Sequence, residues 1–124
     1  MTLFDECKEA LSADFHILEG QCEKDAINIL YQYPFVNGNV SWLELNYIDY
    51  EDINAFIANN HNENDYVFVF VDEIGIPVFR STLTLIAENI YDVTALSPKL
   101  FIFNDKLILQ PLFPTETIRL GIRG

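Results

Sequence analysis

The stretch Tyr66-Val-Phe-Val-Phe-Val71 gives the strongest secondary-structure signal in this sequence. Its β-branched and aromatic side chains favour a strand, and both faces of that strand would be apolar. We expect it at the centre of a sheet with both faces covered, because an exposed apolar edge would promote aggregation. The residues from Asp72 to Gly75 then predict a turn into a second strand over residues 76–80. Because Pro77 has no backbone N–H, this second strand should lie near a sheet edge or start late.

Weaker signals on both sides of this hairpin complete an α+β pattern. Apolar residues at helical spacing alternate with short apolar runs that turn residues bound. The predicted fold class is α+β, with a mainly antiparallel twisted sheet of about six strands packed with about four helices, in a single domain over residues 1–124. Beyond the central hairpin, we expect helices that begin after Thr2, near Ala26, after Asp49 and after Ser81, and strands over residues 15–18, 40–45, 100–103, 106–110 and 118–122.

Charge is distributed unevenly along the chain. There are 19 Asp and Glu residues against 7 Lys and Arg residues, which gives a formal net charge of −12. The stretch from residue 25 to residue 79 contains acids but no Lys or Arg, whereas bases prevail after Asp92. This charge has the wrong sign for contacts with nucleic-acid phosphates or anionic membranes. If the carboxylates share one face, they would attract a cationic partner; the alternative is that they only keep the protein in solution.

Residues that could hold a metal ion or a cofactor are sparse. His61, Glu63 and Asp65 alternate in a polar loop, and such side chains bind zinc, but a solvated loop is the simpler interpretation. Cys7 and Cys22 have no metal-ligand spacing. The N-terminus lacks the basic and apolar parts of a secretory signal, so we expect a cytoplasmic protein with reduced thiols. No apolar run approaches the length of a membrane span. The sequence predicts no metal, cofactor or membrane partner.

Two pairs of adjacent carboxylates are the remaining candidates for catalysis. Glu51 and Asp52 form one pair, and Asp72 and Glu73 form the other. Paired carboxylates perform acid–base chemistry in many enzymes. Each pair also has a structural interpretation: the first would lie in the first turn of a helix, where the dipole favours anions, and the second in a hairpin turn. A small enzyme that uses a carboxylate pair therefore stays open as an alternative, although we predict no catalytic residue.

Aromatic side chains accompany the early acids. Trp42, Tyr47 and Tyr50 fall in the segment Ser41-Trp-Leu-Glu-Leu-Asn-Tyr-Ile-Asp-Tyr-Glu-Asp52. Trp and Tyr are enriched among the residues that dominate protein interfaces, although they also fill cores. Carboxylates beside them would accept charge-assisted hydrogen bonds from Lys and Arg. An aromatic and acidic surface is what a tight binder of a basic protein would present.

Three stretches give the chain a family likeness: Tyr31-Gln-Tyr-Pro-Phe-Val-Asn-Gly38, Tyr66-Val-Phe-Val-Phe-Val-Asp72 and Leu96-Ser-Pro-Lys-Leu-Phe-Ile-Phe103. With its small size, acidity and lack of a catalytic constellation, the chain resembles immunity proteins of bacterial contact-dependent growth inhibition or a related polymorphic toxin system. The resemblance implies a one-to-one complex with a cognate toxin domain, commonly a cationic nuclease, whose active site or substrate groove is covered. It assigns no individual residue.

The leading hypothesis is an immunity protein that neutralises a cognate basic toxin domain by occlusion. The first alternative is an acidic mimic of nucleic acid that antagonises a DNA- or RNA-binding enzyme. The second is the small enzyme described above, and a subunit or adaptor without chemistry is the plainest interpretation. The predicted partner-binding residues are Glu44, Tyr47, Asp49, Tyr50, Glu51, Asp52, Asp72 and Glu73.

Overall fold

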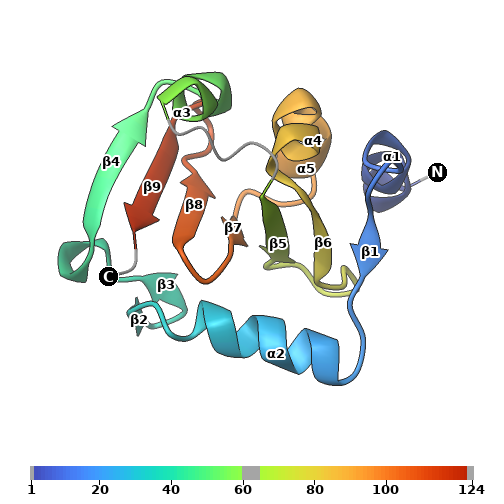
Figure 1. The fold of residues 1–124 in the computed structure, drawn as a ribbon, viewed down its shortest axis with the longest axis horizontal. Coiled ribbons are helices and arrows are strands. Elements are labelled where there is room, and N and C mark those ends of the chain that lie inside the picture. The colour runs from blue at the N-terminus through green and yellow to red at the C-terminus, as the bar shows by residue number, and fades with distance from the viewer. Residues whose placement is uncertain (1, 60–64, 123–124) are drawn as a thin grey trace.

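A seven-stranded, wholly antiparallel sheet forms the centre of the molecule (Figure 1). The computed structural model describes residues 2–59 and 65–122, and the strand count applies to these residues. From one edge of the sheet to the other, the strands are β1 (His16–Ile17), β6 (Phe79–Thr82), β5 (Tyr66–Val71), β7 (Leu100–Phe103), β8 (Leu107–Pro111), β9 (Ile118–Ile122) and β4 (Asn46–Tyr50).

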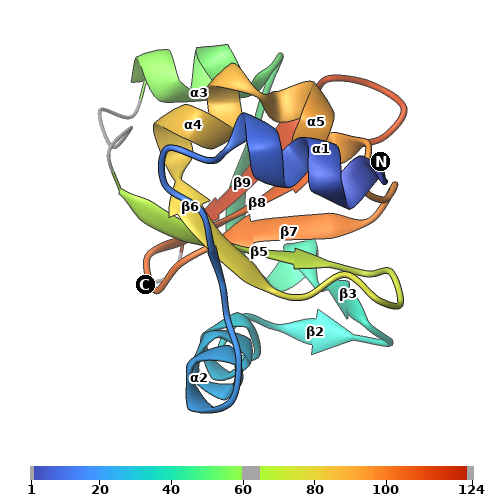
Figure 2. The same cartoon turned by 90° about the vertical axis from the view of Figure 1, so that its right-hand side faces the viewer.

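Helices cover both faces of this sheet. Figure 2 shows a layer of helices on one face of the sheet, and α2 with the β2–β3 hairpin on the other. This arrangement confirms the predicted α+β class with antiparallel pairing. The first layer holds α1 (Leu3–Ala10), α3 (Ile53–Asn59), α4 (Leu83–Glu88) and α5 (Ile90–Thr94), and the second holds α2 (Gln21–Leu30), β2 (Phe35–Val36) and β3 (Asn39–Val40).

Strand β5 lies inside the sheet, between β6 and β7, as its apolar sequence predicts. Val67, Val69 and Val71 are buried in the core that the four-helix layer covers. Phe68 and Phe70 point to the other side and pack against the clusters beneath α2. Both faces of the strand are therefore covered, and this expectation is confirmed.

The hairpin of β7 and β8 is fixed by its turn residue. The Asn104 side-chain oxygen accepts hydrogen bonds from the backbone N–H groups of Lys106 and Leu107, at 2.8 and 3.0 Å. The buried Tyr33 hydroxyl donates to the Asn104 carbonyl at 2.7 Å, which ties the α2 layer to this turn. The two strands expected over residues 100–103 and 106–110 are therefore confirmed, and they pair as one hairpin.

The segment before α3 differs from the prediction. We expected Asp49 to cap a helix, but residues 46–50 form strand β4 at the sheet edge. Asp49 lies opposite Arg119 of β9, and this cross-strand pair favours the extended backbone. The side chain that caps α3 is Asp52, whose Oδ1 accepts a hydrogen bond from the Ala55 N–H at 2.8 Å. The expected cap is therefore three residues too early.

Other boundaries also shift. Of the strand expected over residues 40–45, only Val40 belongs to a strand, β3, because residues 42–44 form the short 3-10 helix η1 (Trp42–Glu44). Strand β6 begins at Phe79, after Pro77, which confirms the late start. The helix expected after Ser81 is capped by Thr82 instead, whose Oγ1 accepts from the Leu85 N–H.

No described helix has the length and apolar character required to cross a membrane.

Candidate functional site

The outward face of the β4–β9 pair carries a compact group of charged and aromatic side chains. The Arg119 guanidinium donates two hydrogen bonds to the Asp49 carboxylate, from Nε to Oδ1 at 2.8 Å and from the terminal nitrogen to Oδ2 at 3.0 Å. This fork lowers the pKa of Asp49 from its ordinary value and raises the pKa of Arg119. The charge of Asp49 is thus compensated within the chain.

Aromatic rings hold this ion pair in place. The Arg119 guanidinium carbon lies 4.5 Å from the centre of the Tyr47 ring and 5.7 Å from that of Trp42. The Trp42 indole N–H donates to the side-chain oxygen of Gln110 at 3.1 Å. Packing of a guanidinium over aromatic rings is itself stabilising. Trp42 and Tyr47 therefore have structural partners on this face of β4.

The junction between β4 and α3 holds two more of the predicted residues. Glu51 is exposed, and Asp52 is half-buried because it caps α3. The Tyr50 ring packs edge-on against the buried Phe56 ring, with 5.7 Å between their centres. Tyr50 thus contributes to the core, whereas Glu51 and Asp52 are presented at the end of the strand.

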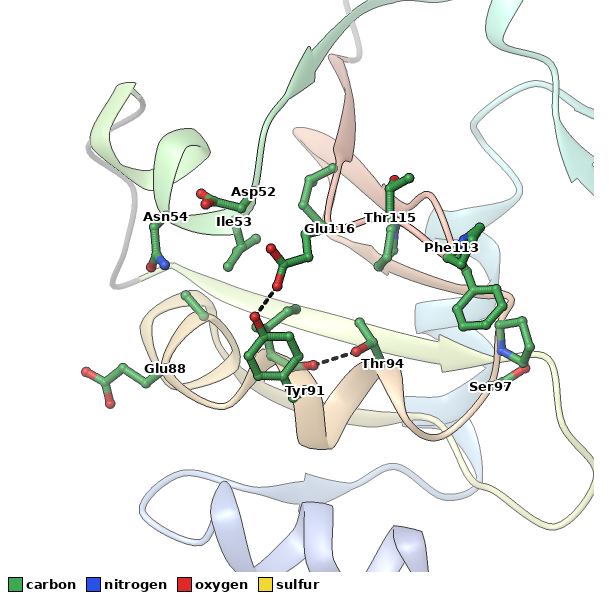
Figure 3. A pocket seen from close by; sticks show the side chains of 16 residues that line it. Asp52, Ile53, Asn54, Glu88, Tyr91, Thr94, Ser97, Phe113, Thr115 and Glu116 are labelled. Carbon is green, nitrogen blue, oxygen red and sulfur yellow. Dashed lines mark hydrogen bonds between the residues drawn. The ribbon is translucent and has the colours of Figure 1, made fainter.

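A groove of about 400 Å³ opens beside this junction, between α3, the α4–α5 layer and the connection from β8 to β9 (Figure 3). Its wall includes Ile53, Ile90 and Ile118, so much of it is apolar. No Lys or Arg occurs among the described residues that line it. The acidic residues that line it are Asp52, Glu88 and Glu116. Figure 3 shows the Glu116 carboxylate inside the groove beside Tyr91, and Asp52 and Glu88 at the α3 end with their carboxylates directed outward.

Tyr91 stands between the acidic and apolar parts of this groove. Its hydroxyl donates a hydrogen bond to the Glu116 carboxylate (Figure 3). This hydrogen bond and the nearby negative charge raise the pKa of Tyr91 above its ordinary value. Tyr91 is 71% exposed and Phe113 is 68% exposed, so the groove presents two rings to solvent.

The second predicted carboxylate pair follows β5 at the same end of the sheet. The register places Val71 beside Leu100, and Tyr50 beside Ile118, so the residues after Val71 and Tyr50 leave the sheet at one end. Three strands lie between β5 and β4, which gives four spacings of about 4.8 Å each. The twist of the sheet turns the β5–β6 connection further from the β4–α3 junction (Figure 1).

The groove spans the distance between these two carboxylate pairs. Asp52 lines one end of it, and Ser97 lines the other (Figure 3). The Ser97 hydroxyl donates to the backbone carbonyl of Asp72 at 3.5 Å. Lys99 lies 3.4 Å from the Asp72 carboxylate, whereas Glu73 is exposed. The two pairs therefore follow the same row of paired residues, but the twist of the sheet carries them apart, with the β4–α3 junction at the top of Figure 1 and the β5–β6 connection at the bottom.

The remaining predicted residues lie along β4, away from the β4–α3 junction. Glu44 is exposed on η1, which precedes β4, so the five-residue strand separates it from Glu51 by about 17 Å. Asp49 and Tyr47 occupy the β4 face described above. The eight predicted residues thus follow an edge and an end of the sheet, and do not form one compact cluster.

Sequence reasoning missed three residues of the groove: Glu88, Tyr91 and Glu116. Glu88 and Tyr91 come from α4 and α5, and Glu116 comes from the β8–β9 connection. Their proximity to Asp52 depends on pairing between distant strands, and no local pattern signals it.

Two of the three loop residues considered for zinc, His61 and Glu63, lie outside the described residues. Within the described ranges, no group of three His, Cys, Asp or Glu side chains is placed to hold a metal ion.

Comparison with known proteins identifies the family. The family model of the "CdiI immunity protein EcoliA0-like" group matches residues 1–121. A search of curated protein sequences gave no match. The match confirms the likeness to immunity proteins of contact-dependent growth inhibition, and it spans nearly the whole chain. This chain therefore belongs to the CdiI immunity protein family, EcoliA0-like, and its function is to neutralise a toxin.

Proposed function

We propose that this immunity protein neutralises a basic toxin domain, such as a nuclease, by binding it one-to-one in the cytoplasm and covering its active site or substrate groove. The docking surface lies along the row of paired residues between Glu51 and Asp52 at one end and Asp72 and Glu73 at the other, and it includes the groove between the two pairs. Tyr50 supports this surface from the core on the same side of the sheet. Tyr47 and Asp49 contact Arg119 on the α2 side, and Glu44 lies before β4, so these three residues would serve only as its periphery. The protein acts by binding and not by catalysis.

The observation that carries this proposal is the number of carboxylates without an internal counter-charge. The chain has a net charge of −12. In residues 2–59 and 65–122, three ion pairs occur: His16 with Asp14, Lys99 with Asp72, and Arg119 with Asp49. Glu51 and Glu73 belong to none of these pairs, and both are exposed. Carboxylates that no internal base neutralises project a negative field toward a basic partner.

Occlusion by an acidic surface suits the chemistry of a nuclease. A nuclease presents positive potential to the phosphates of its substrate, and an inhibitor that presents carboxylates competes for the same groups. Opposite charges also accelerate capture, because long-range attraction raises the association rate. Speed matters here, since one free toxin molecule turns over many substrates.

The test is the association rate between this protein and its cognate toxin domain. Electrostatic capture predicts a rate that falls steeply as salt is added. The double variant Glu51→Lys with Glu73→Lys should lower the rate more than Glu19→Lys with Asp25→Lys, which changes the net charge equally near and on α2, across the sheet. An association rate that does not depend on salt concentration would contradict this docking surface. So would equal decreases of the rate in the two variants.

A further inference from the structure

The groove beside α3 combines features that suit one kind of side chain. Its wall is apolar along Ile90, Ile118 and Pro111, the Glu116 carboxylate lies inside it, and Asp52 lies at its α3 end (Figure 3). A long aliphatic stem with a cationic head matches both parts, because Lys and Arg bury their stems along apolar surface while the head seeks opposite charge. A purely apolar side chain would leave these carboxylates without a counter-charge.

The charges around the groove select a cation and reject an anion. Glu88 adds a third carboxylate to the lining, and no Lys or Arg is present among the described lining residues. Two bases directly follow lining residues along the chain: Lys99 after Pro98, and Arg119 after Ile118. The Lys99 ammonium group lies 3.4 Å from Asp72, and the Arg119 guanidinium is paired with Asp49. The carboxylates of the groove are thus not neutralised by either base. An arriving cationic side chain would find a site with unmet negative charge.

Aromatic rings and a tyrosine hydroxyl group also line this groove and would contact a bound cation or restrain its carboxylate partner. The Tyr91 hydroxyl donates to Glu116, which restrains this carboxylate at the groove. The exposed rings of Tyr91 and Phe113 offer faces to which a guanidinium or an ammonium is attracted. A restrained carboxylate loses less entropy on binding than a mobile one. The arrangement therefore favours a specific contact over diffuse attraction.

We propose that this groove receives a lysine or arginine side chain from a protruding segment of the cognate toxin domain, and that this contact determines which toxin the protein neutralises. The inference rests on the proposed function, because it assumes a basic protein partner. It adds a defined pocket with its own residues, Glu88, Tyr91, Thr94 and Glu116, to an otherwise electrostatic docking surface.

Two variants test the pocket with the cognate toxin domain. Glu88→Lys with Glu116→Lys reverses the charge of the pocket, and Thr94→Phe fills it without changing any charge. Each should weaken the equilibrium affinity by about 30-fold or more, as expected for a buried interface contact. The control, Glu19→Lys with Asp25→Lys, has the same charge change as the first variant. An unchanged melting temperature shows that each variant is folded.

The outcomes separate the pocket from the docking surface. Large losses for both variants, with a small loss for the control, support the pocket. Equal losses for the charge variant and the control, with no loss for Thr94→Phe, overturn the pocket while electrostatic capture survives. Affinity that neither variant changes also overturns it. If the unmodified protein does not bind the toxin domain, or binds independently of salt, the proposed function itself fails.

Discussion

Two regions of this molecule place carboxylates beside aromatic rings, and they differ in one respect. On the β4–β9 face, Asp49 is held by the Arg119 fork, with Tyr47 beside the guanidinium. In the groove, Glu116 has a tyrosine hydroxyl and no ion pair in the described part of the chain. The first carboxylate is used to join two strands, whereas the second is available to a partner. The number of acids in a stretch of sequence therefore says less about binding than whether each acid is paired.

The largest effect should come from disturbing the packed face. A Cβ atom on Gly121 of β9 would lie 2.9 Å from Trp42 Cζ3 and 3.1 Å from Ile108 Cγ2. Gly121→Val should therefore reduce the free energy of unfolding by about 1–3 kcal/mol. Urea unfolding measures this loss, and the fluorescence of Trp42, the only tryptophan, reports its displacement. The exposed neighbour Ile122, changed to Val, should have little effect. If Gly121→Val is equally harmless, this face is not tightly packed.

A smaller effect separates the paired from the unpaired carboxylate. Asp49→Asn should reduce the free energy of unfolding at neutral pH by about 0.5–1 kcal/mol, the scale of a partly exposed ion pair. Glu51→Gln removes an equal charge with no ion pair and should change stability less. Both values come from urea unfolding in low salt. Equal effects would show that the Arg119 contact contributes nothing.

The stability difference between the unmodified protein and Asp49→Asn should depend on pH in a defined direction. The pKa of Asp49 is lower in the folded chain than its ordinary value of 3.8. Its ionised form therefore stabilises the folded state above about pH 3.8, and this contribution is lost as the pH falls through the folded pKa. The difference between the unmodified protein and Asp49→Asn should shrink over that acidic window. A difference that persists at lower pH would contradict the charge-based explanation.

The smallest effect concerns the groove itself. Because Glu116 raises the pKa of Tyr91, Glu116→Gln should lower that pKa toward the ordinary value of 10.0. The ultraviolet absorbance of the phenolate follows this titration, and Tyr91→Phe identifies the signal. Glu9→Gln on α1 serves as a charge-matched control. An unchanged titration after Glu116→Gln would mean that the two side chains do not interact in solution.

The sequence predicts those parts of the fold that local patterns specify. Strand β5 carries apolar residues on both sides, and Asn104 provides the turn of the β7–β8 hairpin, so both were recognisable. Strand β4 was missed because four of its five residues are exposed, so no buried face produces an alternating pattern. Its position depends on pairing with β9 and on the Asp49–Arg119 contact, which joins residues 70 positions apart.

The candidate site was predictable to a similar extent. Glu51, Asp52, Asp72 and Glu73 stood out as adjacent acids, and they do follow the same row of paired residues across the sheet. The charge run could not reveal that Asp49 is neutralised by a base from the far end of the chain. Nor could it reveal Glu116, because its place in the groove follows from the register of β8 and β9.

The most direct test of the central claim is hydrogen–deuterium exchange on the complex with the cognate toxin domain. The claim is that the unpaired carboxylates around the groove mark the docking surface. We predict slower exchange on binding at residues 51–55, 72–76, 91–97 and 112–117. Protection confined to α2 and the β2–β3 hairpin, across the sheet, would contradict the account.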